Sequence, residues 1–141
     1  MKYNGLKSNL NNYAKFIFIY ETEIKNISNL SKFIEYFNAS YNIFFELKLK
    51  NQIKYVKKKE IDDLNGNDNY TLFFTKQKFQ IWDLCRHFRN SFVHGSLSLD
   101  GDKLIIKDKN HGKLTSDGYL SSKSLKEFIK KVIEEYENKE L

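Results

Sequence analysis

The strongest constraint on the fold of this chain is a long run of apolar residues near its start, spaced by three and four positions. Between residues 5 and 27 this stripe consists of Leu6, Leu10, Tyr13, Ile17, Tyr20, Ile24 and Ile27. Such spacing places apolar side chains on one face of an α-helix. Phe16, Phe18 and Ile19 widen the stripe, which is typical of a helix buried between several neighbours. The segment therefore predicts one helix, or two nearly continuous ones.

The rest of the chain predicts four further helices, because apolar residues recur at steps of three and four in each of them. Their expected ranges are 30–37, 40–56, 72–94 and 121–136. Asn29 and Ser31 are candidate N-caps of the first, and Ser121 or Ser122 is the expected start of the last. Gly95 is the expected stop of the helix over 72–94, since glycine often follows a helix end.

Before the last helix the spacing changes. The stretch LSLDGDKLIIKD has short β-forming runs on either side of Asp100-Gly101, which is the pattern of a β-hairpin. Residues 61–70 and 109–119 have the Asn, Asp and Gly content of loops. No internal repeat or linker is evident. We therefore expect a single domain over residues 1–141, folded as an all-α helical bundle with a small β-hairpin inserted before the last helix.

The charge and the cysteine content indicate the kind of partner and the compartment to expect. The 24 Lys and Arg outnumber the 18 Asp and Glu, which gives a net charge of +6 and favours an anionic partner, most commonly nucleic acid. The single cysteine, Cys85, cannot form an intramolecular disulfide, so nothing favours an oxidising compartment. The apolar run FIFIY is far too short to span a bilayer. We expect a cytoplasmic protein with no membrane contact.

The segment CRHFRNSFVHG holds two of the three histidines in the chain, together with two arginines and an asparagine. On a helix with about 100° per residue, the residues around it divide into two opposite arcs. The apolar arc, expected in the core, contains Ile81, Leu84, Cys85, Phe88 and Phe92. The polar arc contains Asp83, Arg86, His87, Asn90 and His94. Arg89 lies between the arcs, where its stem can pack while its guanidinium reaches outward.

Two interpretations of the polar arc are open. A polar helix face is commonly only solvated, and a histidine in the last turn interacts favourably with the helix dipole. The particular residues favour a second interpretation, cleavage of RNA through the 2′-hydroxyl. Histidine can exchange a proton near neutral pH, and arginine supplies a permanent cation for the phosphate. A neutral amide can position either group, and this chemistry requires neither a metal nor a cofactor.

The stretch RNSFVHG resembles the signature of HEPN domains (higher eukaryotes and prokaryotes nucleotide-binding), an Arg followed by a polar residue and a His. Arg89, Asn90 and His94 match it, with four residues between the Arg and the His. The hairpin and the final amphipathic helix are similar to one bacterial branch of the family. The resemblance implies a compact helical bundle that forms a homodimer with its motif helices facing each other. It also implies catalytic roles for Arg89, Asn90 and His94.

Many HEPN domains are metal-independent endoribonucleases in toxin–antitoxin, abortive-infection or other anti-phage systems, with an antitoxin or defence protein as a partner. Others are inert, and the alternative is therefore a catalytically inactive module that binds RNA or protein as a dimer. HEPN toxins that are silenced by a nucleotidyltransferase carry a Tyr two residues after the motif His. Ser96 stands there in this chain, so that form of control is not expected.

Other charged residues are candidate contacts to the RNA backbone. Arg86 and His87 are expected to line the same groove as the motif. The run KYVKKKE contributes four lysines, which either contact phosphate or form a solvated helix end: Lys54, Lys57, Lys58 and Lys59. One cysteine and three histidines give no ligand spacing of a known zinc site, so no metal is expected.

Overall fold

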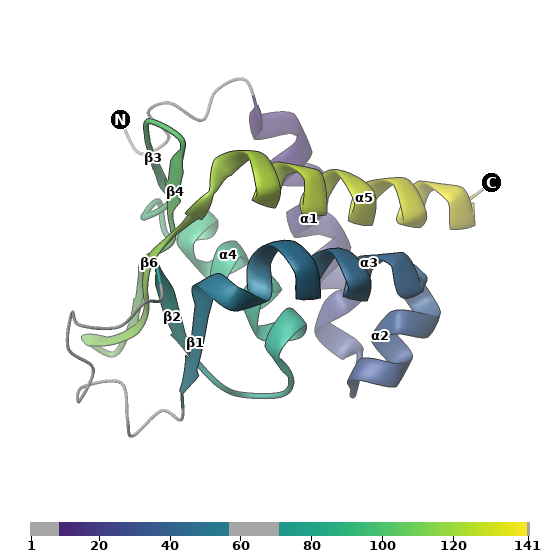
Figure 1. The fold of residues 1–141 in the computed structure, drawn as a ribbon, viewed down its shortest axis with the longest axis horizontal. Coiled ribbons are helices and arrows are strands. Elements are labelled where there is room, and N and C mark those ends of the chain that lie inside the picture. The colour runs from purple at the N-terminus through teal and green to yellow at the C-terminus, as the bar shows by residue number, and fades with distance from the viewer. Residues whose placement is uncertain (1–8, 57–70, 141) are drawn as a thin grey trace.

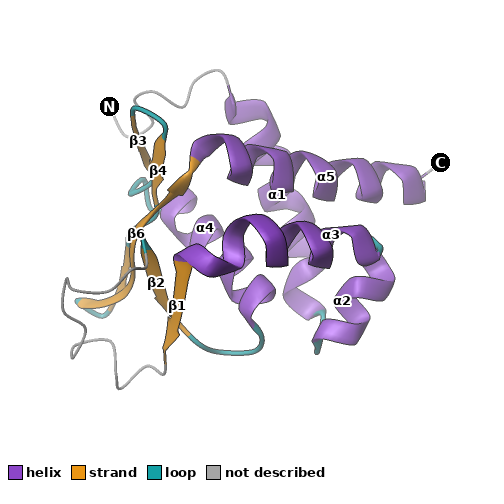
Figure 2. Cartoon of the chain, in the orientation of Figure 1, coloured by secondary structure: helices purple, strands orange, loops and turns teal. Residues whose placement is uncertain are grey.

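The computed structural model describes residues 9–56 and 71–140, in which a layer of helices lies on one side of a β-sheet (Figure 1, Figure 2). The α-helices are α1 (Leu10–Thr22), α2 (Leu30–Phe37), α3 (Ala39–Phe44), α4 (Gln80–Val93) and α5 (Ser122–Glu140). Short helical turns join some of them, namely η2 (Ile24–Asn26), η3 (Phe45–Leu49) and η4 (Lys50–Gln52). The strands are β1 (Ile53–Val56), β2 (Leu72–Thr75), β3 (Ser98–Asp100), β4 (Lys103–Ile105), β5 (Asp108–Asn110) and β6 (Lys113–Ser121).

Several helix boundaries agree with the apolar spacing. Helices α1 and η2 fall within the predicted range 5–27, of which the first residues lie outside the described part of the chain. Asn29 is confirmed as the cap of α2, because its side chain accepts a hydrogen bond from the backbone N–H of Lys32 at 2.9 Å. Helix α5 begins at Ser122, as predicted, and the hydroxyl of Ser121 accepts a hydrogen bond from its first turn.

Strand β6 organises the sheet. The strand order is β1-β2-β6-β4-β3, with β5 also paired to β6. Strand β2 runs along one edge of β6, and β5 and β4 share the other edge. Only β1 and β2 are parallel among the described strands; the other pairs are antiparallel. Because β6 continues directly into α5, the longest strand and the longest helix form one segment that connects the two layers (Figure 1).

The prediction of an all-α fold is wrong, since the described residues form a six-stranded sheet as well as helices. The start of the predicted helix 72–94 is strand β2, the end of 40–56 is β1, and the expected loop 109–119 belongs to β5 and β6. Strands β1 and β2 have four residues each, too short to show a clear period of two, and β2 pairs with β6 far along the sequence. Strands β5 and β6 form a local hairpin, but their Asn, Asp and Gly content is that of a loop. The hairpin around Asp100-Gly101 is confirmed as the β3–β4 pair.

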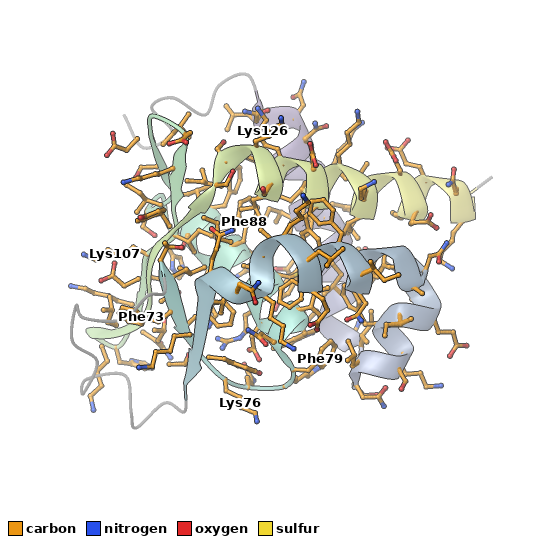
Figure 3. The ribbon with its side chains drawn as sticks, in the orientation of Figure 1. Phe73, Lys76, Phe79, Phe88, Lys107 and Lys126 are labelled. Carbon is orange, nitrogen blue, oxygen red and sulfur yellow. The ribbon has the colours of Figure 1, made fainter. Side chains whose placement is uncertain are left out.

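Helix α4 is fixed to the helical layer by aromatic packing. Phe88 is 1% exposed and lies in the interior of the molecule (Figure 3). Its ring makes edge contacts with Tyr13 and Phe16 of α1, at centroid distances of 5.2 and 5.5 Å. Such pairs contribute about 1 kcal/mol each beyond the area they bury. Cys85 is buried beside this cluster, as the apolar arc predicted. The motif helix is therefore held rigidly against α1.

Gly118→Ala is expected to destabilise the protein by at least about 2 kcal/mol, because the residue combines a left-handed backbone with a close approach to β2. Its φ is +128°, and a Cβ there would lie 2.1 Å from the carbonyl oxygen of Thr71. Gly101→Ala is the matched control, since its φ is +62° but no atom lies within 4 Å of the added Cβ. The control is expected to cost about 1 kcal/mol. Urea denaturation of both variants measures the difference, and equal losses would contradict the role assigned to Gly118.

Candidate active site

The motif helix ends sharply, which returns the chain to the sheet. Helix α4 stops at Val93 with His94 as its C-cap, so the predicted stop at Gly95 is confirmed. The backbone N–H groups of Ser96 and Leu97 both donate to the carbonyl oxygen of Ser91, at 2.8 and 3.0 Å. These bonds satisfy one of the free carbonyls of the last turn and direct the chain into β3.

His94 is an exposed imidazole held by a buried carboxylate. Its side chain is 54% exposed, and its Nδ1 lies 2.8 Å from Oδ1 of Asp108, whose side chain is 4% exposed. The hydroxyl of Thr115 donates to the backbone carbonyl of Asp108 at 3.2 Å and lies 3.5 Å from its Oδ2. Asp108 was not among the residues expected at the site, because it belongs to a strand too short to be recognised. The only signal for it was its place at the end of the predicted hairpin.

Arg89 and Asn90 lie on the turn before His94. Nε of Arg89 donates to Oε1 of Glu21 on α1 at 2.6 Å, and Nη1 donates to Oδ1 of Asn90 at 3.0 Å. The Arg89 and Glu21 side chains are 30% and 35% exposed, so the pair is open to solvent on one side. Asn90 and His94 are four residues apart and therefore share a face of the helix. The structure thus places the guanidinium, the amide and the imidazole along one end of α4.

Arg86 supports the fold at the other end of α4. Its Nε donates to Oδ1 of Asp83 at 3.0 Å, and its Nη2 donates to the carbonyl oxygen of Thr75 at 3.1 Å. Asp83 is fully buried, although the helical arcs placed it on the polar side. Only 18% of the Arg86 side chain is exposed. Because this guanidinium is already used within the protein, we do not include Arg86 in the proposed RNA surface.

The prediction that His87 lies on a solvated polar face is wrong. The side chain is fully buried and stacks on Phe74 of β2, with ring centroids 5.0 Å apart. Its Nε2 lies 3.0 Å from the carbonyl oxygen of Thr75 and 3.0 Å from Nη2 of Arg86. Burial, and then the adjacent Arg86 guanidinium, lower the pKa of His87 to about 3. This neutral ring is part of the contact between α4 and the sheet. The sheet covers α4 on the side opposite α1. His87 is therefore also left out of the proposed RNA surface.

The predicted lysine cluster is only partly visible. Lys54 lies on β1, whereas Lys57, Lys58 and Lys59 fall outside the described residues. Sequence reasoning missed a second group of exposed lysines, which surrounds Asp108 on the β5–β6 hairpin and comprises Lys107, Lys109 and Lys113. Lys107 lies on the sheet side of the molecule, away from the helical layer (Figure 3). The loop-like composition of this stretch conceals that these lysines belong to the same hairpin as Asp108.

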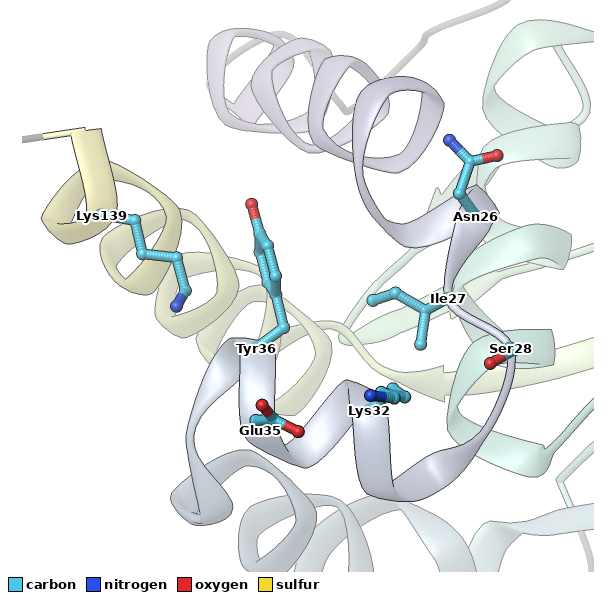
Figure 4. Close-up of a pocket in the computed structure, with 7 residues that line it drawn as sticks. All are labelled: Asn26, Ile27, Ser28, Lys32, Glu35, Tyr36 and Lys139. Carbon is cyan, nitrogen blue, oxygen red and sulfur yellow. The ribbon is translucent and has the colours of Figure 1, made fainter.

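Other parts of the described chain show no competing site of clear chemistry. An open pocket between η2, α2 and the end of α5 is lined by Asn26, Ile27, Ser28, Lys32, Glu35, Tyr36 and Lys139 (Figure 4), none of them a motif residue. Over residues 9–56 and 71–140, no three His, Cys, Asp or Glu side chains gather as metal ligands would. Within the same ranges, every helix is too short or too polar to cross a bilayer.

The buried His87 makes stability depend on pH in a testable way. Its pKa is about 3 in the folded state and near 6.5 in an unfolded chain. Below pH 6.5 the unfolded state therefore binds a proton that the folded state excludes, and stability falls by about 1.4 kcal/mol per pH unit towards pH 3. Urea midpoints measured from pH 7 to pH 4.5 should fall less steeply for His87→Gln than for the wild type. His111→Asn, at an exposed hairpin tip, should keep the wild-type slope; an unchanged slope in His87→Gln would contradict a neutral buried ring.

Comparison with known proteins agrees with the resemblance carried by the motif. The family model of HEPN pEK499 p136 matches residues 2–141, nearly the whole chain. No match was found among curated proteins or among solved structures. Membership in a HEPN family supports a nucleotide-binding, RNase-like module. With the motif at the end of a long helix and a family match over almost its full length, this chain belongs to the HEPN pEK499 p136 family.

Proposed function

We propose that this HEPN domain is a metal-independent endoribonuclease. The observation that carries the proposal is the arrangement at the end of α4, where an exposed imidazole lies one turn after an asparagine that binds a solvent-accessible guanidinium. These are the groups that cleavage through a 2′-hydroxyl needs, namely a proton acceptor or donor and a cation for the phosphate.

In the proposed reaction, the 2′-oxygen attacks the adjacent phosphorus and the 5′-oxygen leaves. His94 takes the proton from the 2′-hydroxyl or returns one to the leaving oxygen. Arg89 stabilises the negative charge that develops on the phosphate, and Asn90 holds the guanidinium in place through its side-chain oxygen. The products are a 2′,3′-cyclic phosphate and a 5′-hydroxyl.

The lysines of the β5–β6 hairpin provide a path for the RNA backbone. Lys107, Lys109 and Lys113 are exposed on both sides of Asp108, which contacts His94. Exposed cations on the hairpin that carries Asp108 would favour a polyanion by neutralising its phosphates. Four lysines earlier in the sequence remain proposed contacts to the RNA backbone: Lys54, Lys57, Lys58 and Lys59.

We further propose a homodimer in which two motif helices face each other across a twofold axis. The reaction needs one group that accepts a proton and another that donates one, and each chain has a single motif histidine. An isologous dimer brings two copies of each motif side chain into one cleft. Val93, beside His94, is 46% exposed, and such an interface would cover it.

The family resemblance favours a role in a toxin–antitoxin or anti-phage system. The alternative is an inert module that binds RNA or protein as a dimer, and one observation favours it. Arg89 is bound by Glu21 within the same chain, at 2.6 Å, so its guanidinium also serves the contact between α1 and α4. The experiments below separate the two functions.

The purified protein is expected to cleave single-stranded RNA in excess EDTA and to leave 2′,3′-cyclic phosphate ends. Attack by the neighbouring hydroxyl gives that product, whereas metal-activated water does not. Mass spectrometry of the cleaved ends identifies the product. Cleavage that stops with EDTA and resumes with magnesium would contradict the proposal.

His94→Ala is the matching variant and should reduce cleavage by at least about 100-fold, the usual contribution of a general acid or base. Its stability should fall by only about 1 kcal/mol, because one partly exposed hydrogen bond is lost. His111→Asn should retain full activity. If His94→Ala instead prevents dimer formation or folding, the inert, structural role is supported.

Heterodimers of Arg89→Ala and His94→Ala chains test the shared cleft. If His94 of one protomer acts with Arg89 of its partner, one complete site remains and cleavage recovers to about half of the wild-type rate. The two variants can be co-expressed with different affinity tags and purified through both. Inactive heterodimers would contradict this pairing of His94 with the partner's Arg89.

A further inference from the structure

We propose that Asp108 is a positioning residue that fixes the tautomer of His94 and turns its Nε2 outward as the proton acceptor. The proposal rests on the proposed ribonuclease function. It adds a residue outside the Arg89–His94 motif, and it assigns separate roles to the two nitrogens of the imidazole.

The contact between the two side chains defines which nitrogen carries the proton. Nδ1 of His94 lies 2.8 Å from Oδ1 of Asp108. An ionised carboxylate can only accept hydrogen bonds, so Nδ1 must be the donor. In the neutral imidazole the other nitrogen, Nε2, then carries the lone pair. Because half of the His94 side chain is exposed while Asp108 is buried, the Asp108 side of the ring faces the protein and Nε2 is available to a substrate.

The position of Asp108 is fixed by bonds to the end of the motif helix. The hydroxyls of Ser91 and Ser96 both donate to the carbonyl oxygen of Lys107, the residue immediately before Asp108. Ser91 is fully buried, and its bond is 3.0 Å long. The start of β5 is thereby anchored beside His94, and the carboxylate cannot move away without breaking these bonds.

A bulge in β6 lies opposite Asp108 of β5. The register shifts between Asp108 and Lys109, which pair with Ser116 and Leu114, so that Thr115 is the extra residue. Thr115 is 8% exposed, and its hydroxyl donates to the carbonyl oxygen of Asp108. Bulges commonly redirect a side chain next to an active site. Here the bulge lies opposite a buried carboxylate that stands between two exposed lysines in the sequence and contacts the motif histidine.

This arrangement has a direct consequence for the reaction. When Nε2 takes the proton of the 2′-hydroxyl, the imidazole becomes positively charged, and the carboxylate at Nδ1 stabilises that charge. A carboxylate in this place acts through orientation and charge and does not itself receive the proton. Replacing it with an amide retains the shape but allows the amide N–H to donate to Nδ1, which favours the tautomer with its proton on Nε2.

Nitrogen NMR of the three histidines tests the tautomer without any substrate. Two-bond proton–nitrogen spectra, recorded at a pH where the imidazole is neutral, should show His94 with a protonated Nδ1 and an unprotonated Nε2, assigned by the loss of its signals in His94→Gln. Asp108→Asn should shift His94 towards the opposite tautomer, whereas Asp102→Asn, at the exposed turn after β3, should leave it unchanged. A neutral wild-type His94 that carries its only proton on Nε2 would overturn the proposal. If Asp108→Asn loses the native fluorescence of the single tryptophan, Trp82, the wild-type spectrum alone decides.

Single-turnover cleavage of a labelled RNA oligonucleotide that contains every dinucleotide step tests the role in the reaction. Asp108→Asn should lower the maximal rate at least about 100-fold, with RNA binding changed less than about threefold. Asp102→Asn should match the wild type. A rate within about threefold of the wild type in Asp108→Asn would overturn the positioning role. If the wild type itself cleaves no RNA, the ribonuclease proposal fails, and the role of Asp108 in the reaction fails with it; the tautomer is still measured separately by NMR.

Discussion

The buried carboxylate of Asp83 is the interaction on which the placement of the motif helix depends. Its Oδ2 accepts hydrogen bonds from the hydroxyl of Tyr55, at 2.6 Å, and from the backbone N–H groups of Gln77 and Lys78, at 3.0 Å. Its Oδ1 accepts from Arg86. A buried charge with fewer partners would be strongly destabilising. Asp83 therefore ties strand β1, the loop after β2 and the first turns of α4 into one unit.

This unit explains why two of the expected site residues are structural. Arg86 compensates the charge of Asp83. His87 packs between α4 and strand β2, which the contacts of Asp83 hold together. The chemistry that remains accessible lies at the opposite end of the helix, around His94. The helix thus has a structural first half and a chemically active second half, although its sequence shows polar residues throughout.

Helical spacing and caps were sufficient to predict the boundaries that depend on local sequence. The cap at Asn29, the stop at Gly95 and the start of α5 all reflect interactions over one turn. The polar arc of α4 failed as a guide because a helical wheel identifies a polar side but not what covers it. That side faces β2, whose partners in the sheet come from residues 53–56 and 116–118. Those pairings depend on distant segments, which local periodicity does not reveal.

The candidate site was likewise predictable where it depends on local sequence and not where it depends on distant segments. Arg89, Asn90 and His94 follow from a motif of six consecutive positions. Asp108 does not, because its approach to His94 depends on hydroxyl contacts from Ser91 and Ser96 and on the irregular pairing of β5 with β6. Glu21 was equally hidden, since it lies on another helix and contacts Arg89 only after the two helices pack.

The two side-chain contacts that hold the site differ in the number of residues between their partners. His94 and Asp108 are 14 residues apart, whereas Arg89 and Glu21 are 68 apart. The entropy of loop closure grows with this separation, and contacts between distant segments generally form late in folding. Local opening of α1 would release the arginine while the histidine and its carboxylate stay together. The position of Arg89 therefore depends on the packing of α1 against α4. The position of His94 depends only on the last turn of α4 and on the β5–β6 hairpin.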